Sequence, residues 1–528
     1  MFDTQVLVVG AGPTGLVLAL WLNRLGLRVR IIDKTPEPGT TSRALVVHAR
    51  TLEFYRQVGL AEAVVDQGLE FTAANLWVRG RKAARVAFGA MGEGLSPFPY
   101  LVIFPQDEHE RLLIDRLSEE GIEVERRTEL LGFEDDGERV RARLRRPDGT
   151  EEACEAAYLA GCDGAHSTVR DVLGVGFPGG TYTHVYYVAD VAANGSVMDG
   201  ELHVALDDTD FLAVFPMAGP QQARLIGAVR GETQARREPL AWQDVSPHMV
   251  ERLSIQLERV NWFSTYHVHH RVADHFQQGR AFLLGDAAHI HSPVGAQGMN
   301  TGIGDAVNLA WKLAAVLHGR AGTPLLHTYE PERIAFARRL VATTDQAFTV
   351  VTSPGPLARF VRVAVAPRLL PVLFTVAFVR RFMFRTISQI GVNYHGSRLS
   401  EGRAGSIRGG DRLPWITTAS SADQEDDNFA PLRSLDWQAH VYGECSAGIA
   451  EACTRRGLAL HVFPWQPTTA RAGLKEGAVY LVRPDGHIGL ADPDASPAKL
   501  EQYLDTRGVL PLAPYAGRAT SPGPRSLA

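Results

Sequence analysis

The sequence has little cysteine and no excess of positive charge. Its four cysteines, Cys154, Cys162, Cys445 and Cys453, form no C-x-x-C pair, and no group of histidines and cysteines has the spacing of a zinc site. We therefore expect reduced thiols in a cytoplasmic protein that binds no metal. The 54 lysines and arginines are outnumbered by 59 aspartates and glutamates, so nucleic acid is not an expected partner.

The sequence also lacks a hydrophobic run long enough to cross a bilayer. The most apolar segment, Leu369–Val379, contains Pro371 and spans 11 residues, about half of the ~20 that a membrane-spanning helix needs. Arginines flank it on both sides, so we expect a buried or interfacial helix. The first apolar run, Gln5–Gly10, is a short strand rather than a secretory signal. We expect no transmembrane segment, and a homodimer is compatible with the sequence.

The stretch VLVVGAGPTG, Val6–Gly15, places three glycines at fixed offsets after an apolar run. Gln5–Val9 is predicted to be a buried strand and Pro13–Leu25 a helix with apolar residues at helical spacing. Leu27–Ile32 follows as a second strand, which completes a βαβ unit.

The spacing of these glycines is typical of dinucleotide binding. Gly10 permits the tight turn, Gly12 lets the backbone approach a pyrophosphate, and Gly15 lets the helix pack closely on the sheet. Asp33 ends the second strand, where a carboxylate accepts hydrogen bonds from a ribose diol. The motif alone does not distinguish NAD from FAD, but its N-terminal position suits a long ligand such as FAD.

Two further motifs favour FAD. Residues Gly161–Arg170 read GCDGAHSTVR, and Gly285–Pro293 read GDAAHIHSP, followed by VGAQGMNTGIGDAVNLAWKLA. Together with the N-terminal glycines, they resemble the three fingerprints of the class A flavoprotein monooxygenases, the para-hydroxybenzoate hydroxylase superfamily. The sequence is most similar to the phenol and polyketide hydroxylases of that group. The resemblance covers about residues 1–395, and the C-terminal part resembles the thioredoxin-like tail of many such enzymes.

The resemblance implies a mixed α/β fold with three parts. A Rossmann-type FAD-binding domain spans 1–180 and 276–395 with its following helices, and a thioredoxin-like domain with a linker spans 396–528. Residues 181–275, between the two FAD-binding segments, form an inserted antiparallel sheet that binds substrate. The two-residue alternation of apolar and polar residues predicts the same sheet independently. Because the tail lacks a redox C-x-x-C, we expect a structural role for it. Asp305–Leu317 is predicted to be a strong helix.

The resemblance also assigns cofactor contacts. Asp286 matches an aspartate that accepts a hydrogen bond from a ribityl hydroxyl, and Pro293 lies beside the flavin ring where oxygen reacts. The glycine-rich turn Gly295–Gly302 precedes a helix whose N–H groups face the flavin N1–C2=O edge. An ordinary helix cap and an ordinary loop are the alternatives. The predicted cofactor-binding residues are Gly10, Gly12, Pro13, Gly15, Asp33, Lys34, Arg43, Gln106, Asp163, Asp286, Pro293, Gly298, Met299 and Asn300.

The middle motif is expected to serve both the FAD pyrophosphate and NAD(P)H. By resemblance, Asp163 and His166 lie there, and with Pro293 they are the predicted catalytic residues. The alternative for Asp163 is bracing of the turn. Arg43 matches an arginine that pairs with phosphate, while Arg50 and Arg111 are weaker candidates for the same role.

The implied reaction needs NADPH or NADH, FAD and O2. Hydride transfer reduces the flavin, O2 adds at C4a, and the distal oxygen of the hydroperoxide attacks an electron-rich ring carbon. The flavin carries this chemistry, so no acid–base pair and no metal are expected.

The substrate is expected to be an aromatic small molecule held by the antiparallel sheet. Phe211, Phe215 and Met217 are candidates for an apolar pocket, although ordinary sheet core is the alternative. Arg224 is placed near the flavin by a looser match. A phenol, a phenylpropanoid and a polycyclic antibiotic all stay open as substrates, as does an antibiotic-modifying role.

The sequence bears on three competing functions. A flavin-dependent halogenase would carry W-x-W-x-I-P, but none of the eight tryptophans lies two residues from another. A non-catalytic FAD-binding sensor or carrier would not consume NAD(P)H. The motif beginning Gly285-Asp286 disfavours a plain NAD dehydrogenase.

Overall fold

The computed structural model describes residues 3–39, 44–87, 91–207, 211–229, 240–292, 294–352, 355, 360–361, 365–417 and 427–510. The chain divides into two compact units. The first comprises Met1–Leu317 and Leu326–Val392, and the second comprises His318–Leu325 and Asn393–Ala528. None of the helices in the described part of the chain is long and apolar enough to cross a membrane.

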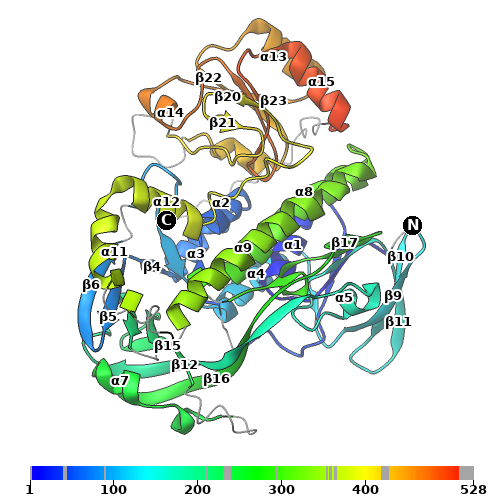
Figure 1. The fold of residues 1–528 in the computed structure, drawn as a ribbon. Coiled ribbons are helices and arrows are strands. Elements are labelled where there is room, and N and C mark those ends of the chain that lie inside the picture. The colour runs from blue at the N-terminus through cyan, green and yellow to red at the C-terminus, as the bar shows by residue number, and fades with distance from the viewer. Residues whose placement is uncertain are drawn as a thin grey trace, which may run out of the picture. The chain divides into compact units, whose positions relative to one another are not determined.

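The first sheet of the first unit has the strand order β17-β18-β11-β1-β2-β8, in which β17 pairs antiparallel with β18; Figure 1 labels β9, β10, β11 and β17 of this sheet. β11 pairs in parallel with β1 and β18, and β2 pairs in parallel with β1 and β8. β9, β10 and the first half of β11 form an antiparallel extension. The strands are β1 (Thr4–Val9), β2 (Val29–Ile32), β8 (Val124–Glu125), β9 (Glu129–Asp135), β10 (Val140–Arg145), β11 (Glu151–Gly161), β17 (Gln277–Gln278) and β18 (Ala281–Leu283).

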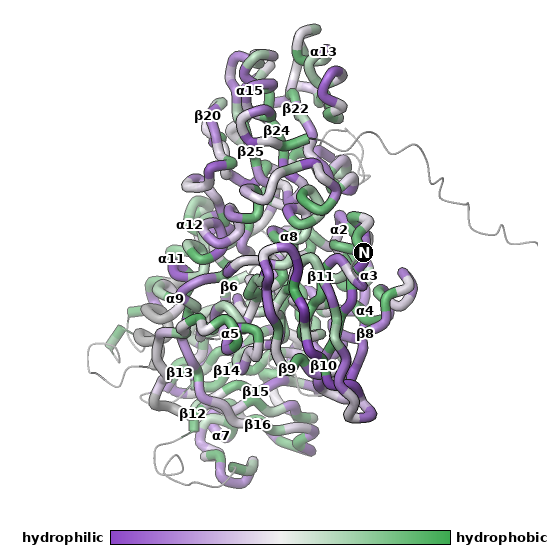
Figure 2. Tube along the Cα trace, turned by 90° about the vertical axis from the view of Figure 1, so that its right-hand side faces the viewer, coloured by the Kyte–Doolittle hydropathy of each residue, from purple (hydrophilic) through white to green (hydrophobic). Residues whose placement is uncertain are grey.

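The second sheet of this unit has the order β19-β16-β12-β15-β14-β13-β5-β6. Its strands pair antiparallel except β13 with β5. Figure 2 shows apolar residues along β14 and β15, and one face of the sheet packs on a core that includes Val191, Leu212 and Leu225. The strands are β5 (Ala73–Val78), β6 (Arg81–Ala87), β12 (Gly179–Asn194), β13 (Leu202–Leu206), β14 (Phe211–Pro216), β15 (Gln222–Ala228), β16 (Gln256–Val272) and β19 (His289–Ile290).

Two helices of the first unit are buried around most of their circumference. α1 (Pro13–Arg24) buries all its residues from Gly15 to Leu22, and α8 (Gln297–Leu317) buries every residue from Asn300 to Ala314. Such helices belong inside a layered fold rather than on its surface. The other helices are α2 (Ala49–Gln57), α3 (Ala61–Gln67), α4 (Gln106–Glu119), α5 (Thr168–Leu173), α7 (His248–Arg252), α9 (Tyr329–Thr352), α11 (Ala366–Thr375) and α12 (Ala377–Ile387).

Short elements complete the first unit. A small sheet joins β3 (Val46–Val47), β7 (Leu101–Ile103) and β4 (Leu69–Phe71). One-turn 3-10 helices occur at η1 (Trp242–Asp244), η2 (Gly285–Ala287) and η3 (Val294–Ala296), and η4 (Thr323–Thr328) precedes α9.

The second unit has the strand order β21-β20-β25-β24-β22-β23. β22 and β23 are parallel and flank α13, whereas β24 and β25 form an antiparallel hairpin before α15. This is a thioredoxin-like arrangement. Its elements are β20 (Glu401–Ala404), β21 (Ile407–Arg408), η6 (Ala430–Ser434), β22 (Gln438–Tyr442), α13 (Ala447–Arg456), β23 (Ala459–Phe463), α14 (Pro467–Arg471), β24 (Val479–Val482), β25 (Ile488–Asp492) and α15 (Pro497–Arg507).

The mixed α/β fold expected from the sequence is confirmed, with two local differences. The glycine-rich segment before Asp305 is not a turn throughout, because α8 already begins at Gln297 and contains Gly298 and Gly302. β5 and β6 also lie in the second sheet, although their residues precede the predicted 181–275 insert. The first difference comes from tertiary packing, which overrides the local preference of glycine for turns. The second comes from the pairing of β5 with β13, which lies far from it in the sequence.

Candidate functional site

The three sequence motifs meet at the carboxyl ends of neighbouring parallel strands. The Gly10 N–H donates to the Ile32 carbonyl at 2.8 Å, and the Cys162 N–H donates to the Val9 carbonyl at 2.8 Å. The Leu284 N–H donates in turn to the Gly161 carbonyl at 3.0 Å. The turns after β1, β11 and β18 therefore lie side by side, at the edge where open parallel sheets bind ligands.

Two glycines of the first motif are required by packing. Gly10 has φ +101°, and a Cβ on it would lie 2.4 Å from the Cys162 carbonyl oxygen. A Cβ on Gly15 would lie 2.0 Å from the Gly10 carbonyl oxygen. Gly12 differs, because a Cβ there would meet no protein atom within 4 Å. The protein's own packing thus explains Gly10 and Gly15, whereas Gly12 leaves its side of the turn open to approach.

The third motif packs directly on the helix that follows the first. A Cβ on Gly285 would lie 2.7 Å from the Thr14 hydroxyl oxygen, and one on Gly302 would lie 2.2 Å from the same atom. Glycines at these two positions let η2 and α8 approach the first turn of α1, where Pro13 is buried. The close approach brings residues nearly 290 positions apart in the sequence into one cluster.

Asp33 lies beside the first glycine turn, as its position in the sequence predicts. One oxygen of its carboxylate accepts the Ala11 N–H at 2.7 Å, and the other accepts the Thr35 N–H at 2.8 Å. The neighbouring Lys34 is exposed. Gln106 begins α4 and donates to Glu110 at 2.8 Å, and Glu110 in turn accepts the Gly39 N–H at 3.2 Å.

The middle motif is held by its own helix cap. Asp163 accepts hydrogen bonds from the Ser167 hydroxyl at 2.5 Å and from the Val169 N–H at 3.1 Å. Burial raises the pKa of Asp163 above its usual value, and these two donors oppose the rise. The carboxylate therefore braces the turn before α5, while His166 on the same turn is exposed.

The two weaker candidates for phosphate binding, Arg50 and Arg111, each form an ion pair within their own helix. Arg50 is buried and pairs with Glu53 at 2.8 Å, whereas Arg111 is exposed and pairs with Asp107 at 2.5 Å. Asp286 is exposed on η2. Arg43 and Pro293 lie outside the described residues, so the structure does not place them.

The turn before α8 is fixed by a buried histidine and a buried amide. His48 donates from Nε2 to the Gly295 carbonyl at 3.1 Å, and burial lowers the pKa of this imidazole to about 3. The Asn300 side chain accepts the His48 N–H at 2.9 Å and donates to the Ala296 carbonyl at 3.0 Å. Gly295 and Ala296 both have positive φ, +76° and +53°. Gly298 and Met299 follow, each partly buried.

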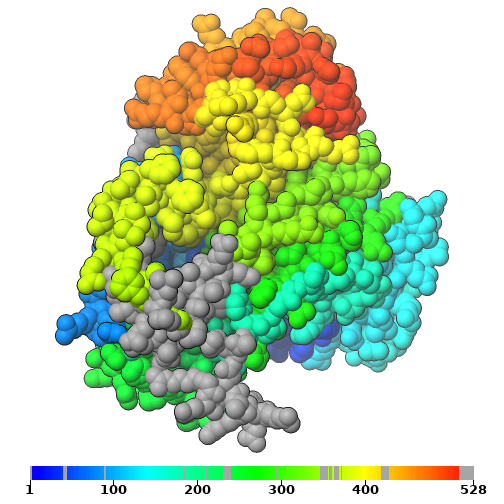
Figure 3. Space-filling model, viewed as in Figure 1, coloured from blue at the N-terminus to red at the C-terminus, as the bar shows by residue number. Residues whose placement is uncertain are grey.

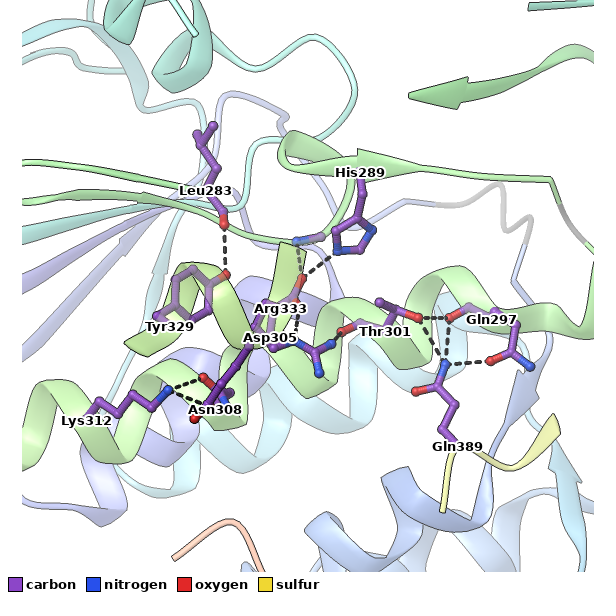
Figure 4. Close-up of polar contacts among 12 residues, drawn as sticks. Leu283, His289, Gln297, Thr301, Asp305, Asn308, Lys312, Tyr329, Arg333 and Gln389 are labelled. Carbon is purple, nitrogen blue, oxygen red and sulfur yellow. Dashed lines mark hydrogen bonds and ion pairs between the residues drawn. The ribbon is translucent and has the colours of Figure 1, made fainter. Parts of the chain in front are cut away.

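A second contact reaches the start of α8 from the segment after α12. Gln389 donates from its amide to the Gln297 side-chain oxygen at 2.6 Å and to the Thr301 hydroxyl at 3.0 Å (Figure 4). Gln297 donates in turn to the Ile387 carbonyl at 3.0 Å. Gln389 has φ +61°, so this arrangement includes a left-handed residue other than glycine.

Asp305 connects α8 to the third motif and to α9. It is fully buried and accepts the Gly285 N–H at 3.0 Å, the His289 Nε2 at 2.7 Å and the Arg333 Nε at 2.5 Å (Figure 4). Burial alone would raise the pKa of Asp305, but Arg333 and His289 outweigh it and hold the pKa below its usual value. Two turns further along α8, Lys312 pairs with Glu332 of α9 at 2.8 Å.

The second sheet presents an aromatic face opposite to its core. Phe211 and Phe215 alternate with Leu212 and Val214, which point into the core on the other side. Phe215 and Ala296, which belongs to the turn before α8, pack against the same buried cluster around Val46, and the Phe211 ring is tilted against Tyr186 with ring centroids 6.0 Å apart. Phe211 and Phe215 therefore share one face of the sheet, Phe215 reaches the apolar cluster that Ala296 of η3 also contacts, and the partly buried Met217 follows the strand.

Arg224 lies on the same face, in a row across the sheet between Phe215 and Asp190. Its guanidinium makes a two-point contact with the Asp190 carboxylate at 2.7 and 2.8 Å. The side chain is 1% exposed, and Nη1 is buried without a hydrogen-bond partner among the residues that the structure describes. A buried N–H without an acceptor is costly, so this atom is a candidate for contact with a ligand.

Sequence reasoning missed the residues that hold the site together: His48, Asp305, Arg333 and Gln389. A signal for part of this set was available, because Thr301, Asp305, Asn308 and Lys312 recur at helical spacing within an otherwise apolar helix. Such a stripe predicts a polar partner on the facing element. Among the described residues no group of three potential ligands is placed to hold a metal ion.

The Asp305 cluster yields a stability prediction. Asp305→Asn should lower the free energy of unfolding by about 3 kcal/mol, because it leaves the buried Arg333 guanidinium without its carboxylate. The double variant D305N/R333M should lose less than the sum of the two single variants. Urea denaturation followed by helical circular dichroism measures all three, and additive losses would contradict the coupling.

The same pair predicts a pH dependence. Because the folded-state pKa of Asp305 lies below its unfolded-state value, its contribution is present above the unfolded pKa. It is lost as pH falls through the folded pKa. The difference in unfolding free energy between wild type and D305N should therefore shrink on acidification below about pH 4. A constant difference down to pH 2 would argue against this assignment.

Comparisons with known proteins agree with this geometry. The family model described as FAD binding domain matches residues 3–344. A 6-methylpretetramide 4-monooxygenase from Streptomyces rimosus is 32% identical over 97% of this chain and 95% of its own. A rifampicin monooxygenase from Rhodococcus hoagii is 32% identical over 74% of this chain and 79% of its own.

Solved structures give the same answer. An anhydrotetracycline hydroxylase from Streptomyces rimosus superposes with a TM-score of 0.77 and 28% identity, covering 97% of this chain and 99% of its own. A ternary complex of aklavinone-11 hydroxylase with FAD and aklavinone has a TM-score of 0.75 and 26% identity, covering 96% and 99%. The chain belongs to the FAD binding domain family and is a flavin-dependent aromatic monooxygenase.

Proposed function

We propose that this enzyme uses NADPH or NADH and O2 to hydroxylate a polycyclic aromatic substrate. One observation carries the proposal. Phe215 on the aromatic face of the second sheet and Ala296 in the turn before α8 pack against one buried cluster, and α8 packs through Gly302 on Thr14, directly after the glycine turn of β1. A planar substrate on that face lies next to the turn that the resemblance assigns to the flavin ring.

The residues present fit FAD. Gly12 opens the first turn to a pyrophosphate, no side chain caps α1 there, and the positive end of the helix dipole favours a phosphate group. By the resemblance, Asp33 accepts hydrogen bonds from the ribose with Lys34 beside it, Gln106 contacts the ribityl–phosphate region, and Arg43 lies near the FAD. When bound, FAD supplies the redox chemistry that accepts a hydride and activates O2.

The remaining residues are assigned to the ribityl chain and flavin ring of FAD or to NAD(P)H. Asp286 holds the ribityl chain, and backbone N–H groups of Gly298, Met299 and Asn300 face the ring; the Asn300 side chain is engaged within the protein. Asp163 acts as a positioning residue by bracing the turn beside Gly10, and the exposed His166 meets NAD(P)H. Pro293 lines the ring by resemblance.

A polycyclic substrate is favoured over a simple phenol by the extent of the aromatic face. Besides Phe215, the face carries Phe211, Tyr186 and Tyr266, whose neighbouring ring centroids lie 6.0 and 6.2 Å apart. A single phenol ring would cover only part of this surface. Met217 extends the apolar lining, and Arg224 donates from Nη1 to an oxygen of the substrate.

The proposal extends to the other parts of the chain. The second sheet, formed largely by residues 181–275, binds the substrate. The parallel sheet, formed by residues of 1–180 and 276–395, binds FAD. Residues 396–528 have a structural role, and the enzyme works in the cytoplasm.

The function is tested by adding NADPH or NADH in air with a simple phenol, anhydrotetracycline or rifampicin. We expect the polycyclic compounds, and not the phenol, to accelerate NAD(P)H oxidation and to yield a product heavier by one oxygen atom. Stimulation by the phenol alone would overturn the polycyclic assignment. Flavin that neither nicotinamide reduces under any condition would favour the sensor function instead.

Substitutions of Gly12 and of Gly15 should have different effects. Gly12→Ala should fold normally but bind FAD at least about tenfold more weakly, because the new methyl group occupies the approach to the pyrophosphate. Gly15→Ala should reduce the yield and thermal stability of the apoprotein, since its methyl group meets the Gly10 carbonyl. Fluorescence titration with FAD and melting of the apoprotein separate the effects. Normal FAD affinity in G12A would refute the assigned role.

Arg224 is tested by two variants with opposite expectations. R224M should raise the KM for substrate by about tenfold and lower the fraction of NAD(P)H oxidation that yields product, because a charge-assisted donor is lost. D190N keeps the guanidinium on the sheet face and should retain most of the coupling. If R224M and D190N behave alike, Arg224 serves only the ion pair.

A further inference from the structure

α11 and α12 expose large apolar side chains on the surface of the first unit. Phe378 is 77% exposed, Val372 62% and Phe382 58%, and Leu369 and Val376 add to the same surface. In Figure 3 the two helices lie on the visible face. Scattered single apolar residues are ordinary on a surface, but a group this dense on two consecutive helices indicates an interaction site.

The segment that carries these residues is also strongly basic. Residues 346–392 contain six arginines and no lysine, aspartate or glutamate. With those six charges set aside from the net charge of −5, the rest of the chain carries −11. Arg368, Arg381 and Arg385 are exposed on α11 and α12. Exposed positive charges of an acidic protein therefore lie on the same two helices as its exposed apolar side chains.

The neighbouring edge strand extends this basic surface. α11 packs against β6, which is the last strand of the second sheet. Its sequence with the preceding turn, RGRKAAR over residues 79–85, contains four basic residues and no acidic one. Arg81 and Lys82 are exposed, while Arg85 pairs with Glu201. We name the exposed residues of β6, α11 and α12 the basic apolar face.

We propose that the basic apolar face docks on an anionic lipid membrane surface. Phenylalanine, valine and leucine side chains enter the boundary between headgroups and acyl chains, and arginines contact the lipid phosphates. This mixture of exposed aromatic, aliphatic and cationic residues is the composition of interfacial helices. The proposal concerns peripheral contact only and does not depend on the identity of the aromatic substrate.

A second copy of the chain is the main competing occupant, and the charge distribution disfavours it. A two-fold interface would bring the same arginines of both copies together. The segment 346–392 contains no acidic residue. Acidic residues from other segments would therefore have to offset the repulsion between these arginines. An anionic bilayer instead offers a high density of negative charge over an apolar interior, which matches both properties of the face.

The test is flotation of the FAD-loaded full-length enzyme with vesicles. Vesicles of phosphatidylglycerol and phosphatidylcholine are compared with pure phosphatidylcholine, at about 50 and about 500 mM salt. We expect binding to the anionic vesicles at low salt and at least about tenfold less binding to the neutral ones. F378S/F382S and R368E/R381E should each reduce binding to the anionic vesicles by at least about tenfold.

Two control variants make the same kinds of substitution outside the basic apolar face. V462S/L510S removes two exposed apolar side chains from the second unit, and R141E/R143E reverses two exposed arginines on β10. Both controls should bind like wild type, and the visible flavin spectrum verifies folding of every variant. Absence of wild-type flotation, or equal losses in the controls and the face variants, would overturn the proposal. A dimer in sedimentation velocity that F378S/F382S dissociates, without flotation, would assign the face to a second copy.

Discussion

The architecture depends on the fully buried carboxylate of Asp305. Three elements that are separate in the sequence, the turn at Gly285, the strand at His289 and α9 at Arg333, all donate to its two oxygens. A buried charge is costly unless it is paired and hydrogen-bonded. Each of the three donors is therefore held in place by its hydrogen bond to the same carboxylate. Because Gly285 also packs on Thr14, the position of α8 relative to the first glycine turn follows from this single constraint.

The start of α8 is held in a different manner, by neutral hydrogen bonds from two sides. His48 and Asn300 fix the carbonyls of Gly295 and Ala296, and Gln389 fixes Gln297 and Thr301. Two residues other than glycine in this arrangement, Ala296 and Gln389, have positive φ. Backbone held in such conformations persists only where the surroundings impose it. The turn beside the proposed flavin position is therefore held by side chains of which two, His48 and Gln389, lie outside the three motifs.

Much of the fold and part of the site could be predicted from the sequence, for reasons that these residues make clear. Gly10, Gly15 and Asp33 act within one βαβ unit, so their spacing contains the geometry that they adopt. His48 and Gln389 act across distances of some 90 to 250 residues, and nothing near them in the sequence indicates a partner. The sequence predicts a turn as far as Gly302, where α8 has already begun, because glycine favours turns locally; here Gly302 lets α8 pack closely on α1. The pairing of β5 with β13 likewise has no local signal.

Because side chains alternate along its strands, the second sheet has one face in the core and an opposite face that we propose binds substrate. On β14, Leu212 and Val214 belong to the core, and Phe211 and Phe215 to the opposite face. On β15, Leu225 belongs to the core while Arg224 lies opposite, next to Phe215. A shift of register by one residue would move Arg224 into the core and Leu225 to the proposed substrate face. The three register shifts of β12 lie in its pairing with β16, whereas the pairings of β12 with β15 and of β15 with β14 are regular, so Asp190, Arg224 and Phe215 align in one row. The core thus fixes which side chains lie on the proposed substrate face.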